Sequence, residues 1–337
     1  MLVRPSALGD VCRSVPVLVS LRRRFPDATI DWLVQDTFAD AILHHPALDN
    51  AVMFPRKALG VSSKRLNLGP TIRWMNRSLR SPRYDLVIDA QGLFRSGLFT
   101  RWTGARRRLG YANAEESGSV FYTDKFGIGR DRHAVDRMLA LIEAGGIEPS
   151  LDTRLYADPA EISWIDSQPW RGGIVLAPTS RWAGKQWPAD RFVSLAQRLL
   201  AHTGRRVIIV GGPGERAQIR PLLDWAGSEP RAVDLVGETS IARLMAVIAR
   251  ADLLVANDSA ALHMGVGFDR PLVALFGPTR VGLVGPFGRA HDVIQHAHIG
   301  DRFDHKDPLA GVPMMERIGV REAADACLAR LVRTVNP

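Results

Sequence analysis

Residues 252–263 read DLLVANDSAALH, an apolar run that changes abruptly into residues that begin helices. The first five have the composition of a buried parallel strand, and Asn257, Asp258 and Ser259 are three consecutive helix N-cap types. A helix N-terminus leaves backbone N–H groups unpaired and carries about half a positive charge, so it can hold phosphate. An ordinary capped helix in any α/β protein would show the same pattern.

A second apolar run follows directly. Residues 270–279 read RPLVALFGPT, which predicts a buried strand that ends in a Gly-Pro-Thr turn. Parallel strands deliver the loops that follow them to one carboxyl edge, where open α/β sheets bind ligands. At this edge Asp258 can accept a hydrogen bond from a ribose hydroxyl, and His263 can supply a proton.

The two runs together resemble glycosyltransferase family 9, the ADP-heptose heptosyltransferases of lipopolysaccharide assembly. Their shared pattern is D-S-x-x-x-H followed by R-P-x-V-x-L-F-G-P-T. The resemblance implies the α/β GT-B fold, in which two Rossmann-like domains with parallel sheets face each other across a cleft. We expect an acceptor-binding domain over 1–160, a junction near 158–173 and a donor-binding domain over 173–318. The helix within 319–337 is expected to pack back on the first domain.

The composition argues against a disordered chain, a cysteine-based zinc protein, a secreted protein and a membrane-spanning protein. The 337 residues suffice for two domains, and 46% are hydrophobic, which is typical of a globular chain. Cys12 and Cys327 form no ligand-spaced pair and fit a reducing cytosol. The first residues lack the pattern of a secretory signal peptide, and no apolar run is long enough to span a membrane.

The net charge of +9 calls for an anionic partner. Residues 1–155 hold 23 Lys and Arg against 16 Asp and Glu, whereas the rest hold 21 against 19. The excess positive charge therefore belongs to the first half of the chain. Within 56–83 there are eight basic residues and no acidic one.

This basic segment includes a predicted helix with apolar residues at helical spacing. Leu68, Ile72, Met75 and Leu79 would share one face, while the other positions include three arginines, Arg73, Arg77 and Arg80. A basic amphipathic helix with Trp74 suits an anionic membrane surface. The alternative is a core-packed helix with a solvated charged face. Nucleic acid is disfavoured, because the aromatic residues do not alternate with the charges as in a stacking platform.

The beginning of the chain matches the family's opening motif. Residues 4–11 read RPSALGDV, with a helix predicted over 11–25. By resemblance Asp10 is the catalytic base, although a plain helix cap would also explain an aspartate here. The DAQGL motif at 89–93 is again similar to the family, particularly to the heptosyltransferases that act on Kdo-lipid A. We place Arg4, Ser6 and Gln91 on the acceptor side, with the three arginines of the basic helix.

The loop after the strand predicted at 173–178 carries the donor-site residues. Residues 185–188 read KQWP, a second match to the family, and hydroxyls with a lysine after a strand are good phosphate ligands. Both Thr179 and Ser180 are candidates for the phosphate contact. By resemblance the donor site comprises Thr179, Ser180, Lys185, Glu215, Thr239, Asp258, Ser259, Ala260 and His263. Ala260 stands where the family usually has glycine.

The resemblance implies an inverting, metal-independent transfer of heptose from ADP-L-glycero-D-manno-heptose to Kdo-lipid A. It implies a monomeric enzyme of the cytoplasm, peripheral on the inner membrane, with neither metal nor other cofactor. The spacings of His291, His296, His298, Asp301 and His305 match no known metal site. The alternatives are a GT-B sugar-nucleotide epimerase, a family 9 transferase with another sugar or acceptor, and a non-catalytic nucleotide-binding protein.

Overall fold

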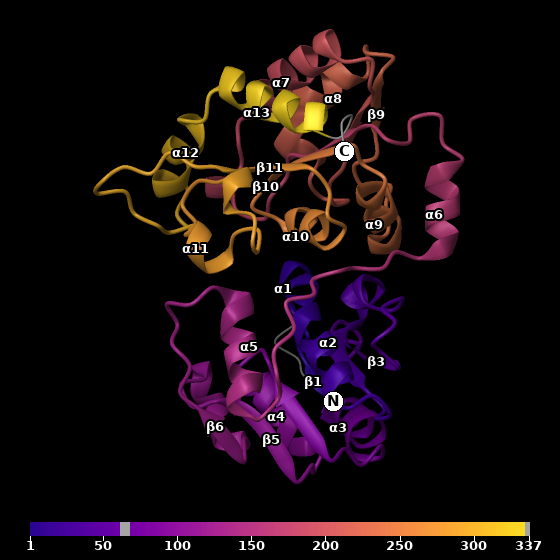
Figure 1. The fold of residues 1–337 in the computed structure, drawn as a ribbon, viewed down its shortest axis with the longest axis vertical. Coiled ribbons are helices and arrows are strands. Elements are labelled where there is room, and N and C mark those ends of the chain that lie inside the picture. The colour runs from indigo at the N-terminus through magenta and orange to yellow at the C-terminus, as the bar shows by residue number, and fades with distance from the viewer. Residues whose placement is uncertain (61–67, 334–337) are drawn as a thin grey trace. The chain divides into compact units, whose positions relative to one another are not determined.

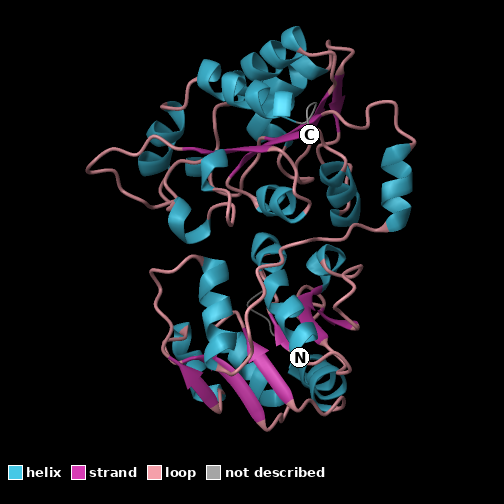
Figure 2. Ribbon diagram, viewed as in Figure 1, coloured by secondary structure: helices cyan, strands magenta, loops and turns pink. Residues whose placement is uncertain are grey.

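The computed structural model describes residues 1–60 and 68–333, and the chain divides into two compact units, Met1–Tyr156 and Ala157–Pro337. Each unit holds a six-stranded parallel sheet, shown as magenta arrows in Figure 2. The strand order is β3-β2-β1-β4-β5-β6 in the first sheet and β12-β11-β10-β7-β8-β9 in the second. In both sheets the chain reverses its direction of growth at the central strand, as in Rossmann-like folds.

The elements of the first unit alternate between strands and helices (Figure 1). Its strands are β1 (Leu2–Val3), β2 (Asp31–Gln35), β3 (Asn50–Phe54), β4 (Leu86–Asp89), β5 (Arg107–Tyr111) and β6 (Asp124–Phe126). Its helices are α1 (Leu8–Arg13), α2 (Val15–Arg24), α3 (Leu68–Met75), α4 (Phe94–Trp102) and α5 (Ala134–Ala144). Short helical turns are η1 (Asp36–Ala41), η2 (Asn76–Arg80) and η3 (Glu115–Phe121).

The second unit repeats this alternation. Its strands are β7 (Ile174–Ala177), β8 (Val207–Ile209), β9 (Ala232–Asp234), β10 (Leu253–Asn257), β11 (Leu272–Leu275) and β12 (Val293–Ile294). Its helices are α6 (Pro159–Asp166), α7 (Ala189–His202), α8 (Arg220–Ala226), α9 (Ile241–Ala249), α10 (Ala260–Gly267), α11 (Val281–Val284), α12 (Pro308–Glu316) and α13 (Val320–Arg333). Short helical turns are η4 (Ala183–Lys185), η5 (Arg216–Ile219) and η6 (Ala290–Asp292).

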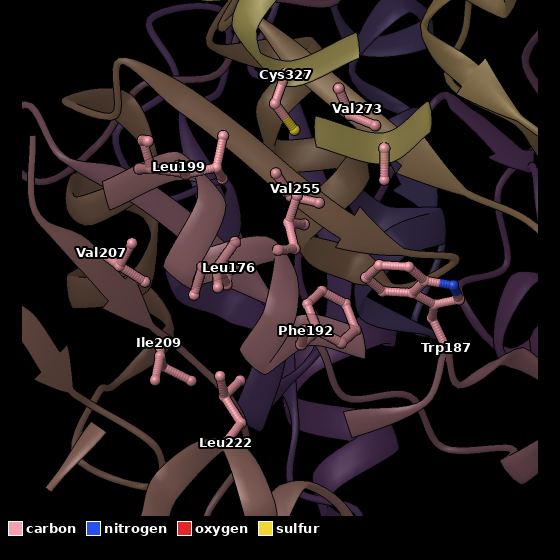
Figure 3. Packing of buried hydrophobic residues seen from close by; sticks show 14 of the residues in the cluster. Leu176, Trp187, Phe192, Leu199, Val207, Ile209, Leu222, Val255, Val273 and Cys327 are labelled. Carbon is pink, nitrogen blue, oxygen red and sulfur yellow. The ribbon is translucent and has the colours of Figure 1, made fainter. Parts of the chain in front are cut away.

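The core of the second unit lies between its sheet and the layer formed by α7, α8 and α13. Phe192 and Leu199 of α7 pack against the sheet residues Leu176 and Val255, and all four are fully buried (Figure 3). Each such side chain contributes about 1.5–3 kcal/mol on removal from water. Every residue of β7 and β10 is buried because helices cover both faces of a parallel sheet.

The final helix packs within the second unit, where its apolar residues lie in the core. Its expected packing on the first domain stays a prediction. Ala323, Ala324, Cys327 and Leu331 are all buried there, and α13 contacts α7, β10 and β11. The small side chains of this face allow the helix to approach the sheet closely.

Two local expectations need correction. The helix predicted over 11–25 is interrupted at Ser14, whose hydroxyl donates to the Asp10 carbonyl, and continues as α2. The predicted junction contains helix α6, which Pro159 begins and which Asp158 caps by accepting from the Ala160 N–H. The salt bridge between Arg243 and Glu161, 2.8 Å long, fixes α6 to α9.

Candidate functional site

The first group of site residues lies where α1 begins, beside the carboxyl end of β1. Asp10 Oδ2 lies 3.1 Å from Nη2 of Arg4, and Oδ1 forms an ion pair with Arg13, one helical turn further on. The Ala7 N–H also donates to Oδ2, at 3.2 Å. Asp10 is therefore held by three donors, and it is more than a simple helix cap.

The arginines set the electrostatics of this carboxylate. Burial alone would raise the pKa of Asp10, but the charges of Arg4 and Arg13 outweigh it, helped by hydrogen bonds from Arg13 and Ala7. The pKa of Asp10 is consequently held well below its usual range. The side chain keeps 25% of its surface exposed, so a ligand at the sheet edge can reach it.

Ser6 and Gln91, both predicted on the acceptor side, come together in this unit. The Ser6 N–H donates to Oε1 of Gln91 at 3.3 Å, and both residues line a cavity of about 110 Å³. Arg56 and Arg95 line the same cavity. Burial lowers the pKa of Arg95, and the neighbouring charge of Arg56 lowers it further.

Asp89 was missed as a functional residue by sequence reasoning, although it begins the DAQGL motif. Its carboxylate accepts from the N–H groups of Gln91 and Gly92, at 2.9 and 3.0 Å, and from the Tyr122 hydroxyl at 2.7 Å. Burial raises the pKa of Asp89 against the effect of these hydrogen bonds. Asp89 therefore fixes the turn that presents Gln91 to the cavity.

The arginines of the basic helix lie apart from this cavity. Arg73, Arg77 and Arg80 are exposed, and Arg80 lines an open groove with Arg101 and Trp102. The expectation for the apolar face is half right, because Met75 and Leu79 are buried whereas Leu68 and Ile72 are exposed.

Only the second half of this helical segment lies over the aromatic cluster of Phe54 and Phe99. Trp74 is part of that cluster, with its ring 5.3 Å from Phe54, and its Nε1 donates to the Met53 carbonyl at 3.1 Å. Trp74 is therefore a packing residue, which corrects its expected role at a membrane surface. Residues 61–67 of the basic segment lie outside the described residues.

The second group of site residues gathers at the carboxyl ends of β7, β8 and β10. Lys185 Nζ lies 2.6 Å from Oδ2 of Asp258, with 14% and 9% of the two side chains exposed. The Ser180 hydroxyl donates to the Asp258 carbonyl at 3.3 Å. The Thr179 hydroxyl donates to Oε2 of Glu215 at 2.6 Å. Five predicted donor-site residues thus form one connected cluster.

Sequence reasoning missed three amides that hold this cluster in shape. Gln218 Oε1 accepts from the Ser180 N–H at 3.3 Å and from Gln186 Nε2 at 3.0 Å. Asn257 Nδ2 donates to the Pro178 carbonyl, which ties β10 to the loop after β7. Gln218 belongs to none of the motifs, and the motifs that include Gln186 and Asn257 do not show which groups their side chains contact.

The remaining predicted donor residues lie around this cluster. Ser259 and Ala260 form the N-cap and first residue of α10, at the end of β10, and His263 is buried one turn further along. Thr239 follows β9 and precedes Ser240, the N-cap of α9. The N-termini of α9 and α10 therefore face the same edge of the sheet, where backbone N–H groups can stabilise a phosphate.

The histidine-rich segment after β12 forms ordinary surface contacts. His296 Nε2 lies 2.8 Å from Oε2 of Glu322, and Asp301 pairs with Arg317. Among residues 1–60 and 68–333, no three His, Cys, Asp or Glu side chains are grouped to hold a metal ion. The same described residues contain no helix with the length and apolarity to span a bilayer.

Comparisons with known proteins place this geometry in a family. The profile of glycosyltransferase family 9 (heptosyltransferase) matches residues 72–311. The chain is 31% identical over 313 residues to lipopolysaccharide heptosyltransferase 1 of Pseudomonas aeruginosa, covering 90% of this chain and 84% of that protein.

Two solved structures show that the fold is shared as well. The ADP-heptose lipopolysaccharide heptosyltransferase II of Escherichia coli aligns with a TM-score of 0.80 at 22% identity, over 99% of this chain and 98% of that one. An E. coli heptosyltransferase with ADP-2-deoxy-2-fluoro heptose aligns with a TM-score of 0.71 at 24% identity, over 94% and 98%. The expected α/β GT-B fold, with a parallel sheet in each unit, is confirmed.

Proposed function

Because this chain belongs to glycosyltransferase family 9, the heptosyltransferases, we propose that it transfers heptose from ADP-L-glycero-D-manno-heptose to Kdo-lipid A. Its activity is that of a glycosyltransferase in lipopolysaccharide core biosynthesis. The observation that carries the proposal is the cluster of Lys185, Asp258 and Ser180 beside the N-terminus of α10. This cluster combines a buried cation, a hydroxyl and helix N–H groups, which together suit a nucleoside diphosphate.

The donor would bind with its diphosphate near Lys185 and α10. Negative charge grows on the departing ADP, and preorganised donors lower the energy of that charge in the transition state. Asp258 would accept from a ribose hydroxyl, while Glu215 and Thr239, in the loops after β8 and β9, would serve the nucleoside. A bound analogue, ADP-2-deoxy-2-fluoro heptose, in the E. coli relative supports this choice of donor.

An anionic acceptor would bind in the first unit. The cavity beside Ser6 and Gln91 is lined by Arg56, Arg95 and Glu116. Burial and the like charge of Arg56 lower the pKa of Arg95, and the charge of Glu116 opposes them. Two neighbouring guanidiniums that repel each other are stabilised by a carboxylate or phosphate between them. This supports an acidic sugar on a phosphorylated lipid as the acceptor.

Asp10 would act as the general base in a single inverting displacement. Its carboxylate takes the proton of the acceptor hydroxyl, the oxygen attacks the anomeric carbon, and the bond to the diphosphate breaks with its electron pair leaving on ADP. In this step Asp10 takes the proton, and Lys185 with the N–H groups of α10 would balance the charge on ADP. We therefore propose a metal-independent mechanism without a cofactor.

The proposal includes a monomeric cytoplasmic enzyme that is peripheral on the inner membrane. The exposed arginines Arg73, Arg77 and Arg80 support contact with anionic lipid, each being worth about 1 kcal/mol near such a surface. A sugar-nucleotide epimerase is not favoured, because the matching family and curated relatives are transferases. A family 9 transferase with another sugar or acceptor is the remaining alternative.

Incubation with ADP-heptose, with and without Kdo-lipid A, tests the proposal. Transfer gives a heptosylated acceptor and ADP by mass spectrometry. An epimerase would instead change the donor sugar without acceptor, and a binding protein would leave both substrates intact. A screen of other ADP-sugars and core oligosaccharides in the same assay would identify a different substrate pair, and would refute the proposed one.

A further inference from the structure

The state of Asp10 in this structure is unsuited to a base. Both carboxylate oxygens already contact a guanidinium, from Arg4 on one side and from Arg13 on the other. The two arginines hold the pKa of Asp10 well below its usual range, in spite of burial. General-base catalysis is most efficient when the pKa of the base lies near the working pH, so this arrangement weakens the proton acceptor.

Arg4 can rearrange toward a ligand. Its Nη1 donates to the Ala90 carbonyl at 2.7 Å, which keeps the side chain at the carboxyl edge of the sheet. Its Nε is buried and, among the described residues, has no hydrogen-bond partner. A buried donor without a partner destabilises the protein, and an anionic ligand that pairs with it would remove this cost.

A third arginine, Arg137, lies close to Tyr111. Its guanidinium carbon is 4.3 Å from the ring centroid of Tyr111. Burial raises the pKa of Tyr111, and the charges of Arg137 and Arg4 act against that effect. Helix α5, which carries Arg137, is joined to the end of α1 by the Ser14 hydroxyl, 3.1 Å from Met138 Sδ. Arg4 and Arg137 therefore both add positive charge around Tyr111.

We propose that Arg4 and Arg13 restrain Asp10 until an acidic group of the acceptor, a sugar carboxylate, draws a guanidinium away from it. The inference rests on the proposed function, because it assigns Asp10 as the base and an acidic saccharide as the acceptor. The guanidinium fork matches a carboxylate in geometry, so the acceptor carboxylate can replace Asp10 as its partner. Asp10 then regains a free oxygen when the hydroxyl to be deprotonated is in place.

The restraint protects the donor. Without acceptor, an unrestrained Asp10 would deprotonate water, and hydroxide would displace ADP from the anomeric carbon to give free heptose. Arg4 and Arg13 act on the reacting atoms through Asp10 in this scheme, and one of them also binds the acceptor carboxylate. Their removal should therefore raise the rate of donor hydrolysis while it lowers the rate of transfer to the acceptor. A loss of folding stability would lower both rates.

The first measurement is donor hydrolysis without acceptor, followed as ADP release from ADP-heptose. Arg13→Gln should raise the hydrolysis rate about tenfold or more, a part of the range known for general bases. Adding Asp10→Asn to Arg13→Gln should abolish the increase. Arg23→Gln, an exposed arginine in the last turn of α2, is the matched control and should leave hydrolysis unchanged. Arg4→Gln is an equivalent second variant if Arg13→Gln fails to fold.

The second measurement compares an acceptor that carries the carboxylate with the same saccharide reduced to the alcohol. Wild-type kcat should fall about tenfold or more on the reduced acceptor, whereas Arg13→Gln should show a much smaller difference between the two. A third acceptor, without its phosphates, distinguishes carboxylate from phosphate as the trigger. A fall in kcat on that acceptor alone would overturn the assignment to a carboxylate.

Unchanged hydrolysis in folded Arg13→Gln and Arg4→Gln would overturn the restraint. Equal kcat on intact and reduced acceptors would overturn its release by the acceptor carboxylate. Failure of the proposed function gives a different result, since wild type would then transfer heptose to none of the acceptors. An increase in hydrolysis that depends on Asp10 would still support the restraint in that case.

Discussion

Replacement of Lys185 by methionine separates two roles that the structure gives to this lysine. Its ammonium is 2.6 Å from the Asp258 carboxylate, and both side chains are largely buried. A lysine that binds the diphosphate contributes a charged hydrogen bond of about 1.5–3 kcal/mol. Lys185→Met should then weaken ADP binding about ten- to 150-fold. A lysine that only neutralises Asp258 would weaken binding indirectly, by leaving a negative charge beside the diphosphate.

The double variant Lys185→Met with Asp258→Asn distinguishes the two roles. Loss of one partner from a buried ion pair costs about 3–5 kcal/mol of folding stability, whereas neutral replacement of both costs much less. The double variant should therefore recover most of the thermal stability that Lys185→Met loses. If Lys185 contacts the diphosphate, ADP affinity stays low in the double variant even though the site is neutral and folded.

Isothermal calorimetry with ADP on wild type, Lys185→Met and the double variant distinguishes the two roles, with thermal unfolding as the control. Lys306→Met serves as a matched surface substitution, because Lys306 is exposed in the same unit. Near-native ADP affinity in the double variant would remove Lys185 from the diphosphate site and leave it only as the partner of Asp258.

Three further predictions concern Asp10, the arginines of the basic helix and the two cysteines. Asp10→Asn should lower turnover by at least about two orders of magnitude with donor affinity unchanged, and near-native single-turnover transfer would refute its role as base. Arg73, Arg77 and Arg80 changed together to glutamate should abolish salt-sensitive binding to anionic vesicles but preserve transfer to a soluble acceptor; equal losses on lipid-linked and soluble acceptors would point to a role in the sugar site or the fold. Burial raises the pKa of Cys12 and Cys327 to about 12, so both thiols should resist a thiol reagent at pH 8 and react after unfolding; fast labelling of native protein would contradict this.

The sequence predicts β7, β10 and β11 because these strands are short apolar runs that end in turn residues. Residues 252–263 form β10 and the start of α10 as expected. Helix α6 escaped prediction although Asp158 and Pro159 are an ordinary helix start, because prolines and glycines nearby suggested a linker. The apolar face of the final helix predicted burial, and α13 lies in the core of the second unit.

Side-chain partners within the candidate site could be predicted less well than its residues. Motifs placed Lys185 and Asp258 in one site, yet their direct contact joins positions 73 residues apart and depends on the register of β7 beside β10. Likewise, Arg4 reaches Asp10 because the chain leaves β1 beside the start of α1, whereas Arg13 follows Asp10 by three residues on the same helix. A motif records which residues a site uses, whereas the pairing among them is set by the packed fold.

In each unit an aspartate carboxylate contacts a cationic side chain, which suggests that both substrates bind by exchanging partners in an ion pair. Asp10 contacts Arg4 and Arg13, and Asp258 contacts Lys185. The proposed substrates bring their own anions, an acidic acceptor and a diphosphate, which compete for the same cations. Each exchange would release a carboxylate beside a hydroxyl, on the acceptor for Asp10 and on the ribose for Asp258. The ion pairs would thus keep the charges of the empty site balanced, and substrate binding would convert them into catalytic and binding contacts.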